Sequence, residues 1–201
     1  GVITDETRIQ AALPTIQFAL DKGAKIVLAS HLGRPKTDED KVRLSLRPVA
    51  ERLGELLNVE VLLVEEPSSD APKALLSGLK KNQIILLENL RFEAAEEKNQ
   101  KSLCEKWASY TDVYVNDAFG ASHRAHASIV GLPNLVKQKG VGFLINKEVE
   151  MLDQILKGKD TPFVTVMGGA KVSDKMAVIE TLVSRVDSLM IGGAMAYTFL
   201  F

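Results

Sequence analysis

Short apolar runs rich in Val, Ile and Leu alternate with longer stretches of helical spacing in the first part of the chain. Four runs predict buried strands, at Lys25 to Ser30, Val59 to Val64, Gln83 to Leu87 and Val113 to Val115. Thr7 and Ser45 precede two intervening helical patterns, which end at Gly23 and Leu57. Buried strands that alternate with helices predict an α/β fold with a parallel sheet covered on both faces.

A second alternating unit follows the stretch Lys157-Gly158-Lys159-Asp160. Its predicted elements are a strand at Phe163 to Met167, a helix from about Ser173 to Arg185, a strand at Leu189 to Ile191 and a helix that reaches Phe201. Between the units, Phe143 to Leu156 carries apolar residues at helical spacing, which predicts a connecting helix. We therefore expect two doubly wound, Rossmann-like parallel-sheet domains, 1–142 and 159–201, joined by a linker helix at 143–158, with the second domain truncated.

Composition restricts the classes of partner. The 201 residues are 46% hydrophobic, which is typical of a globular protein, and 25 basic against 26 acidic residues give a net charge of −1. No overall field therefore favours nucleic acid or an anionic membrane, and any anion site must be local. The single cysteine, Cys104, favours a reducing compartment, so we expect a cytoplasmic protein. The absent initiator Met and the end within an apolar run suggest a fragment.

Basic residues follow three of the predicted strands, where an open parallel sheet binds its ligands. The segments are Ser30-His31-Leu32-Gly33-Arg34-Pro35, Glu88-Asn89-Leu90-Arg91-Phe92 and Ser122-His123-Arg124-Ala125-His126. The planar fork of arginine binds carboxylate or phosphate through two parallel hydrogen bonds, so this edge predicts a site for a small, multiply charged anion. Taken singly, each of these arginines is better explained as a solvated surface charge, and only their gathering at one edge favours an anion site. A loop histidine is more often structural than catalytic.

Two glycine turns predict a second anion site. The strand ending at Met167 runs into Gly168-Gly169-Ala170-Lys171, and Lys175 follows four residues later. Glycines let a ligand approach the backbone, and the start of the next helix offers free amide groups to phosphate. If both lysines are helical, they lie on one face over that helix end. The turn Gly192-Gly193 could line the same pocket.

Seven segments, in order along nearly the whole chain, resemble the phosphoglycerate kinase family. They are Ile3 to Pro14, Gly23 to Pro35, Glu88 to Phe92, Asn116 to Gly120, His123 to His126, Gly140 to Leu144 and Gly168 to Lys175. The resemblance implies a reversible phosphoryl transfer from 1,3-bisphosphoglycerate to ADP, giving 3-phosphoglycerate and ATP in glycolysis. It also implies that the family's first strand precedes Gly1 and that most of the nucleotide domain follows Phe201, so we expect these residues alone to be inactive.

The resemblance assigns roles to particular residues. In the first domain, Arg8, His31, Leu32, Gly33, Arg34, Arg91 and Arg124 would bind 3-phosphoglycerate. In the second, Gly169, Ala170, Lys171, Lys175, Gly192 and Gly193 would contact the nucleotide. Arg8, Lys171 and Lys175 would be catalytic, with Mg²⁺ carried by ADP or ATP and no metal ligand in this part of the chain. The intact protein would be a monomer that closes about the linker helix.

Three alternatives remain open. Glu88 and Asp117 share the basic edge, where they would orient or neutralise the arginines, although a paired-carboxylate hydrolase is conceivable. A phosphoglycerate-binding module without catalysis would use the first site alone. A Rossmann-type dehydrogenase is remote, because no Gly-x-Gly-x-x-Gly follows a strand.

Overall fold

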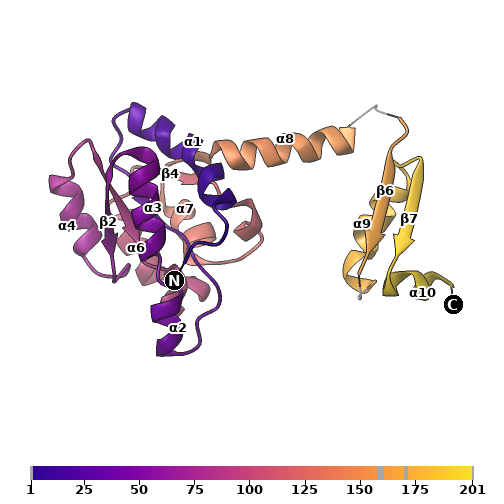
Figure 1. Cartoon of the computed structure of the whole chain (residues 1–201), viewed down its shortest axis with the longest axis horizontal. Coiled ribbons are helices and arrows are strands. Elements are labelled where there is room, and N and C mark those ends of the chain that lie inside the picture. The colour runs from indigo at the N-terminus through magenta and orange to yellow at the C-terminus, as the bar shows by residue number, and fades with distance from the viewer. Residues whose placement is uncertain (1, 158–160, 170–171, 201) are drawn as a thin grey trace. The chain divides into compact units, whose positions relative to one another are not determined.

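The computed structural model describes residues 2–157, 161–169 and 172–200, which form two compact units (Figure 1). The units are Gly1–Glu148 and Val149–Phe201. Every strand pair in the described residues is parallel, so the predicted α/β class with parallel sheets is confirmed. The units divide inside helix α8 (Phe143–Lys157), which covers the predicted linker helix. The roles given to residues 1–142, 143–158 and 159–201 stay predictions.

The strands of the first unit form two sheets. One contains β1 (Val27–Leu28), β2 (Glu60–Val64) and β3 (Gln83–Leu87) in the order β1-β3-β2. The other pairs β4 (Val113–Asn116) with β5 (Gln138–Val141). Strand β5 was not predicted, because its four residues are all exposed and their sequence, Gln-Lys-Gly-Val, lacks an apolar run. The strand predicted at Lys25 to Ser30 is real but only two residues long.

Helices cover both faces of the β1-β3-β2 sheet. The helices of the first unit before α8 are α1 (Thr7–Asp21), α2 (Asp38–Arg43), α3 (Arg47–Leu57), α4 (Ala71–Gly78), α5 (Ala94–Glu97), α6 (Lys101–Ala108) and α7 (Leu132–Leu135), with short turns η1 (Leu90–Phe92), η2 (Phe119–Ala121) and η3 (Ala127–Gly131). Successive residues of β3 point to opposite faces, so Ile84 packs with Ile16 of α1 and Leu53 of α3, whereas Ile85 packs with Trp107 of α6. Burying each such side chain stabilises the fold by about 1.5 to 3 kcal/mol.

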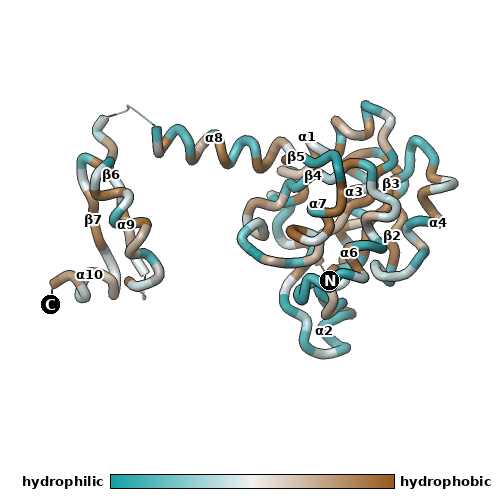
Figure 2. Tube along the Cα trace, turned by 180° about the vertical axis from the view of Figure 1, so that it is seen from behind, coloured by the Kyte–Doolittle hydropathy of each residue, from teal (hydrophilic) through white to brown (hydrophobic). Residues whose placement is uncertain are grey.

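The hydropathy of the residues agrees with this arrangement of helices on both faces of a sheet. In Figure 2 the apolar positions lie along the strands and the inner sides of the helices of the first unit, and the chain around α2 is mostly hydrophilic. A capping box begins α2: Thr37 accepts from the Asp40 amide, and the Asp40 side chain accepts from the Thr37 amide. None of the helices in the described ranges is long and apolar enough to cross a membrane.

The second unit pairs β6 (Val164–Gly168) with β7 (Ser188–Gly192). Between them lie a single turn, η4 (Ser173–Lys175), and α9 (Met176–Val183); α10 (Ala194–Leu200) follows β7. The predicted helix from Ser173 therefore starts as a tighter 3₁₀ turn and becomes α-helical only at Met176. Ile179 and Met195 are buried in this unit.

Candidate functional site

Six cationic or titratable side chains meet at the carboxyl ends of β1, β3 and β4. Arg8 lies in the first turn of α1, and the other five follow the three strands. We call this set the basic cluster: Arg8, His31, Arg34, Arg91, Arg124 and His126. The charges of Arg91, Arg124, His126 and Arg8 all act on the His31 ring, and those of Arg124 and Arg34 act on Arg91. The predicted convergence is therefore confirmed for these six residues, and their binding roles stay predictions. His123 is exposed, and no contact joins it to the cluster among the interactions of the described residues.

The surroundings of His31 disfavour its charged form. Part of the residue reaches solvent, but protein atoms packed around the ring remove water from it, and this desolvation is the largest cause of a lowered pKa. The positive charges of Arg91 and Arg124 are the next causes, and together they lower the pKa of His31 to about 4. His31 is therefore neutral near pH 7, when it can still donate or accept a hydrogen bond.

Arg91 is an enclosed arginine of the basic cluster, with a side chain that is 7% exposed. Its Nη1 donates to the backbone oxygen of Gly33, and its Nε lies 3.6 Å from the Glu97 carboxylate. That Nε is buried and has no hydrogen-bond partner among the described residues. Burial, and then the charge of Arg124, lower the pKa of Arg91. A buried guanidinium with an unused donor can gain a hydrogen bond from an incoming anion.

Asn89 holds the loop that carries His31 and Arg34. Its fully buried side-chain amide donates to the backbone oxygens of Leu32 at 2.7 Å and Leu44 at 3.0 Å. Gly33 between His31 and Arg34 adopts φ +62°, a conformation that favours glycine. Sequence reasoning gave Asn89 no role, although a polar residue directly after the apolar strand β3 was the available signal.

Glu88 and Asp117 serve the starts of helices, in place of the predicted role of orienting the arginines. Glu88 accepts from the Ser45 hydroxyl at 2.6 Å and from the Leu46 amide at 2.7 Å, directly before α3. Asp117 accepts from the Ile145 amide in the first turn of α8. The free amide groups and positive dipole end of a helix N-terminus attract carboxylates, which explains both positions. Each of the two carboxylates is therefore engaged at the start of a different helix.

The two glycine turns lie side by side in the second unit. Gly168 at the end of β6 is in register with Gly192 at the end of β7. Gly169 and Gly193 have φ of +147° and +64°, which L side chains rarely adopt. The predicted proximity of the turns is therefore confirmed.

Lys175 folds back over the first glycine turn. Its Nζ donates to the backbone oxygen of Gly168. Lys175 ends the 3₁₀ turn η4 and precedes α9 with φ −120°, so it does not lie on an α-helical face. Ala170 and Lys171 lie outside the described residues.

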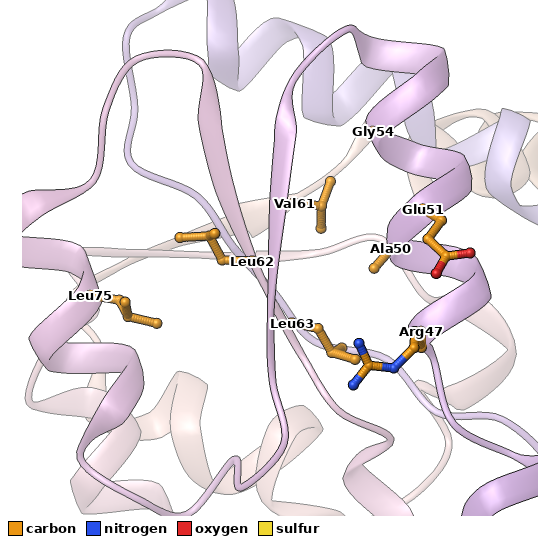
Figure 3. Close-up of a pocket in the computed structure, with 8 residues that line it drawn as sticks. All are labelled: Arg47, Ala50, Glu51, Gly54, Val61, Leu62, Leu63 and Leu75. Atoms are coloured by element: carbon orange, nitrogen blue, oxygen red, sulfur yellow. The ribbon is translucent and has the colours of Figure 1, made fainter.

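A metal cluster and a hollow in the surface are the remaining features that could extend the site. Within the described ranges, no three His, Cys, Asp or Glu side chains are grouped so that they could hold a metal ion. A hollow of about 440 Å³ lies against β2, lined by residues of β2 and α3 and by Leu75 of α4 (Figure 3). It contains no residue of the basic cluster, and its charged members are Arg47 and Glu51.

Comparison with known proteins identifies the family. The family model for phosphoglycerate kinase matches residues 1–201. A phosphoglycerate kinase of Bdellovibrio bacteriovorus is 62% identical over 200 residues, and one of Anaeromyxobacter dehalogenans is 52% identical over 201 residues. Both alignments cover 100% of this chain but 50% and 51% of those proteins, so the chain spans about half the length of the curated relatives it matches.

Solved structures agree with the sequence comparison. The phosphoglycerate kinase of Coxiella burnetii matches with a TM-score of 0.84 and 40% identity, over 100% of this chain and 50% of that one. The enzyme of Pyrococcus horikoshii gives a TM-score of 0.82 and 34% identity, over 99% of this chain and 50% of that one. The family match and the parallel-sheet architecture coincide over the whole sequence, and the chain belongs to the phosphoglycerate kinase family.

Proposed function

We propose that this chain supplies the phosphoglycerate site and part of the nucleotide site of an enzyme that transfers a phosphoryl group reversibly from 1,3-bisphosphoglycerate to ADP. The basic cluster is the observation that supports this proposal most directly. Four arginines and two histidines gather where α1 begins and where three strands end. The net charge of the chain is only −1, so this positive charge is local. Such local positive charge suits a small anion that carries both a carboxylate and a phosphate.

In this proposal each side chain of the basic cluster has a simple task. Arg34, Arg91 and Arg124 bind the anionic groups of 3-phosphoglycerate through charge-assisted hydrogen bonds. His31, which is neutral near pH 7, contributes a hydrogen bond rather than a charge. The backbone of Leu32 and Gly33 shapes the loop around the ligand. Arg8 at the start of α1 stabilises the charge of the transferring phosphoryl group.

The two glycine turns of the second unit would contact the nucleotide phosphates. Gly169, Gly192 and Gly193 leave the backbone open to close approach, and Lys175 already lies over the turn. Lys171 would act on the transferring group directly. Mg²⁺ would arrive with ADP or ATP and neutralise phosphate charge. Transfer would be in line and direct, without a phosphoenzyme, because positioning and charge neutralisation supply most of the catalysis.

In this proposal, kinase activity requires a chain of the relatives' full length, of which these 201 residues span about half. We therefore expect the 201 residues alone to show no measurable kinase activity, since catalysis by positioning requires the complete set of positioning groups. The intact protein would be a cytoplasmic monomer. The glycolytic direction of the reaction would form ATP.

Calorimetry with 3-phosphoglycerate, and separately with MgADP, tests this proposal against a phosphoglycerate-binding module. In a chain of the relatives' length that contains this sequence, we expect both ligands to bind and a coupled assay to report turnover. Binding of 3-phosphoglycerate without MgADP binding or turnover would favour the module. Binding of neither ligand would refute both functions.

A further inference from the structure

The carboxylate of Asp117 joins three segments that are far apart in the sequence. Asp117 follows β4 directly, and its Oδ2 accepts a hydrogen bond of 2.5 Å from the hydroxyl of Thr15 in α1. Its Oδ1 accepts from the Ile145 amide at 3.1 Å, within the first turn of α8. The Thr15 hydroxyl oxygen in turn accepts from the Phe143 amide at 2.9 Å. One carboxylate and one hydroxyl thus satisfy two free amide groups at the start of α8.

Two further contacts lie at the same junction. A Cβ on Gly142 would come within 2.2 Å of the Asp117 carboxyl carbon, so glycine leaves the space that the carboxylate occupies. Gly142 does not have a positive φ, and its conformation is therefore open to other residues. The rings of Phe18 in α1 and Phe143 in α8 meet edge to face, with centroids 5.4 Å apart. The junction is consequently held by packing as well as by hydrogen bonds.

The elements that hold the start of α8 also carry the basic cluster. Helix α1 begins next to Arg8 and reaches Thr15 two turns later, and the chain after β4 continues from Asp117 to Arg124 and His126. In both Figure 1 and Figure 2, α1 and β4 lie at the end of α8 that belongs to the first unit. The helix then continues into the second unit, because the units divide between Glu148 and Val149. The first turn of α8 is therefore held by the same elements that carry the basic cluster.

We propose that Asp117 is a positioning residue for phosphoryl transfer, which aligns α8 with the basic cluster through Thr15. This inference rests on the proposed function. Asp117 has no contact with substrate in this role; it sets the geometry of the helix that leads to the nucleotide-binding unit. Loss of the carboxylate should therefore reduce turnover while 3-phosphoglycerate affinity is retained. Misplacement of reacting groups by about 1 Å can cost roughly 100-fold in rate, so we expect kcat to fall by about 10-fold or more.

The test compares variants in a kinase chain of the relatives' length that contains this sequence. Asp117→Asn removes the charge, Thr15→Val removes the hydroxyl, and Gly142→Ala displaces the carboxylate with a methyl group. Thr15→Ser keeps the hydroxyl and should restore kcat to within about twofold of the parent, a difference of about 0.4 kcal/mol. The matched control is Thr111→Val, which removes a 2.7 Å hydrogen bond from the same residue type at the end of α6.

Two measurements separate positioning from a purely structural effect. The first is the pair of kcat and the calorimetric Kd for 3-phosphoglycerate, at a temperature at which each variant is folded. The second is the distribution of distances between spin labels on Lys81→Cys and Glu180→Cys, which are exposed positions of the two units; the native Cys104 is buried and should not react. We expect Asp117→Asn and Thr15→Val to lower kcat, to leave Kd within about twofold, and to broaden the label distances.

Several results would overturn this role for Asp117. One is an unchanged kcat in both Asp117→Asn and Thr15→Val, and another is a loss of kcat that Thr15→Ser does not recover. An equal loss of kcat in the Thr111→Val control would also refute the positioning role. If the parent chain shows no transfer at all, the proposed function fails, and the label distances still decide whether Asp117 aligns α8.

Discussion

The side-chain amide of Asn89 donates a 2.7 Å hydrogen bond to the backbone oxygen of Leu32, which joins the end of β3 to the loop after β1. Asn89→Ala should lower the free energy of unfolding by about 1 to 3 kcal/mol, because the Leu32 and Leu44 oxygens lose a buried donor. Affinity for 3-phosphoglycerate should fall with it. Urea unfolding and calorimetry measure the two effects, with the exposed Asn82→Ala as the control. Equal stability of the two variants would contradict the prediction.

The arginines of the basic cluster should each contribute to anion binding. Arg34→Ala, Arg91→Ala and Arg124→Ala should each weaken 3-phosphoglycerate binding by about 1.5 to 3 kcal/mol, because each removes a charge-assisted hydrogen bond. Arg91→Ala should also reduce stability, since its guanidinium is buried and bonded to Gly33. Calorimetry checks the affinities, and Arg47→Ala, whose partner is Glu65, is a matched control outside the cluster. Unchanged affinity in all three variants would remove the basis for the anion site.

The lowered pKa of His31 predicts a pH dependence of stability. Between about pH 6.5 and about pH 4 the unfolded chain takes up a proton at this residue and the folded chain does not, so the free energy of unfolding falls as pH falls. Above about pH 6.5 both states are neutral and the contribution is constant. His31→Gln should therefore lose less stability than the parent as the pH is lowered through this window.

A proton NMR titration checks the same residue directly. Bound 3-phosphoglycerate should raise the pKa of His31, because its negative charge offsets Arg91 and Arg124, which disfavour the imidazolium in the free protein. The resonance lost in His31→Gln identifies the residue. A His31 midpoint near its usual value in the free protein would show that the cluster does not act on the ring.

The lysines after β6 should have separable effects on kinetics. Lys171→Ala should mainly lower kcat, whereas Lys175→Ala should also weaken nucleotide binding, because Lys175 lies against the glycine turn. Gly169→Ala should resemble Lys175→Ala, since an added Cβ would come within 2.6 Å of the Lys175 ammonium at a φ of +147°. Steady-state kinetics with varied MgADP distinguish the three variants. A change in KM alone for Lys171→Ala would reverse the assignment of the two lysines.

Hydrophobic patterning was sufficient for β3, a strand that is buried on both faces. Strand β3 was predicted with its correct ends, because Ile84 to Leu87 form a continuous apolar run in the centre of a sheet. Strand β5 has no such run, and its parallel pairing with β4 is specified by neighbours far away in the sequence. Edge and exposed strands lack the local signal that central strands carry.

Sequence alone determined the α/β class, the family resemblance and the meeting of the basic residues that follow β1 and β3, because parallel strands of one sheet place their following segments on one side. The tertiary structure decided that β4, which lies in a separate sheet, brings Arg124 and His126 to the same place. Only the tertiary structure decided the hydrogen-bond partners of the polar residues. Glu88 was expected beside arginines but caps the start of α3, and Asp117 accepts from Thr15, which lies 102 residues earlier. A carboxylate is compatible with either an arginine or a free helix amide, and the choice depends on which of them the packed elements bring within about 3 Å.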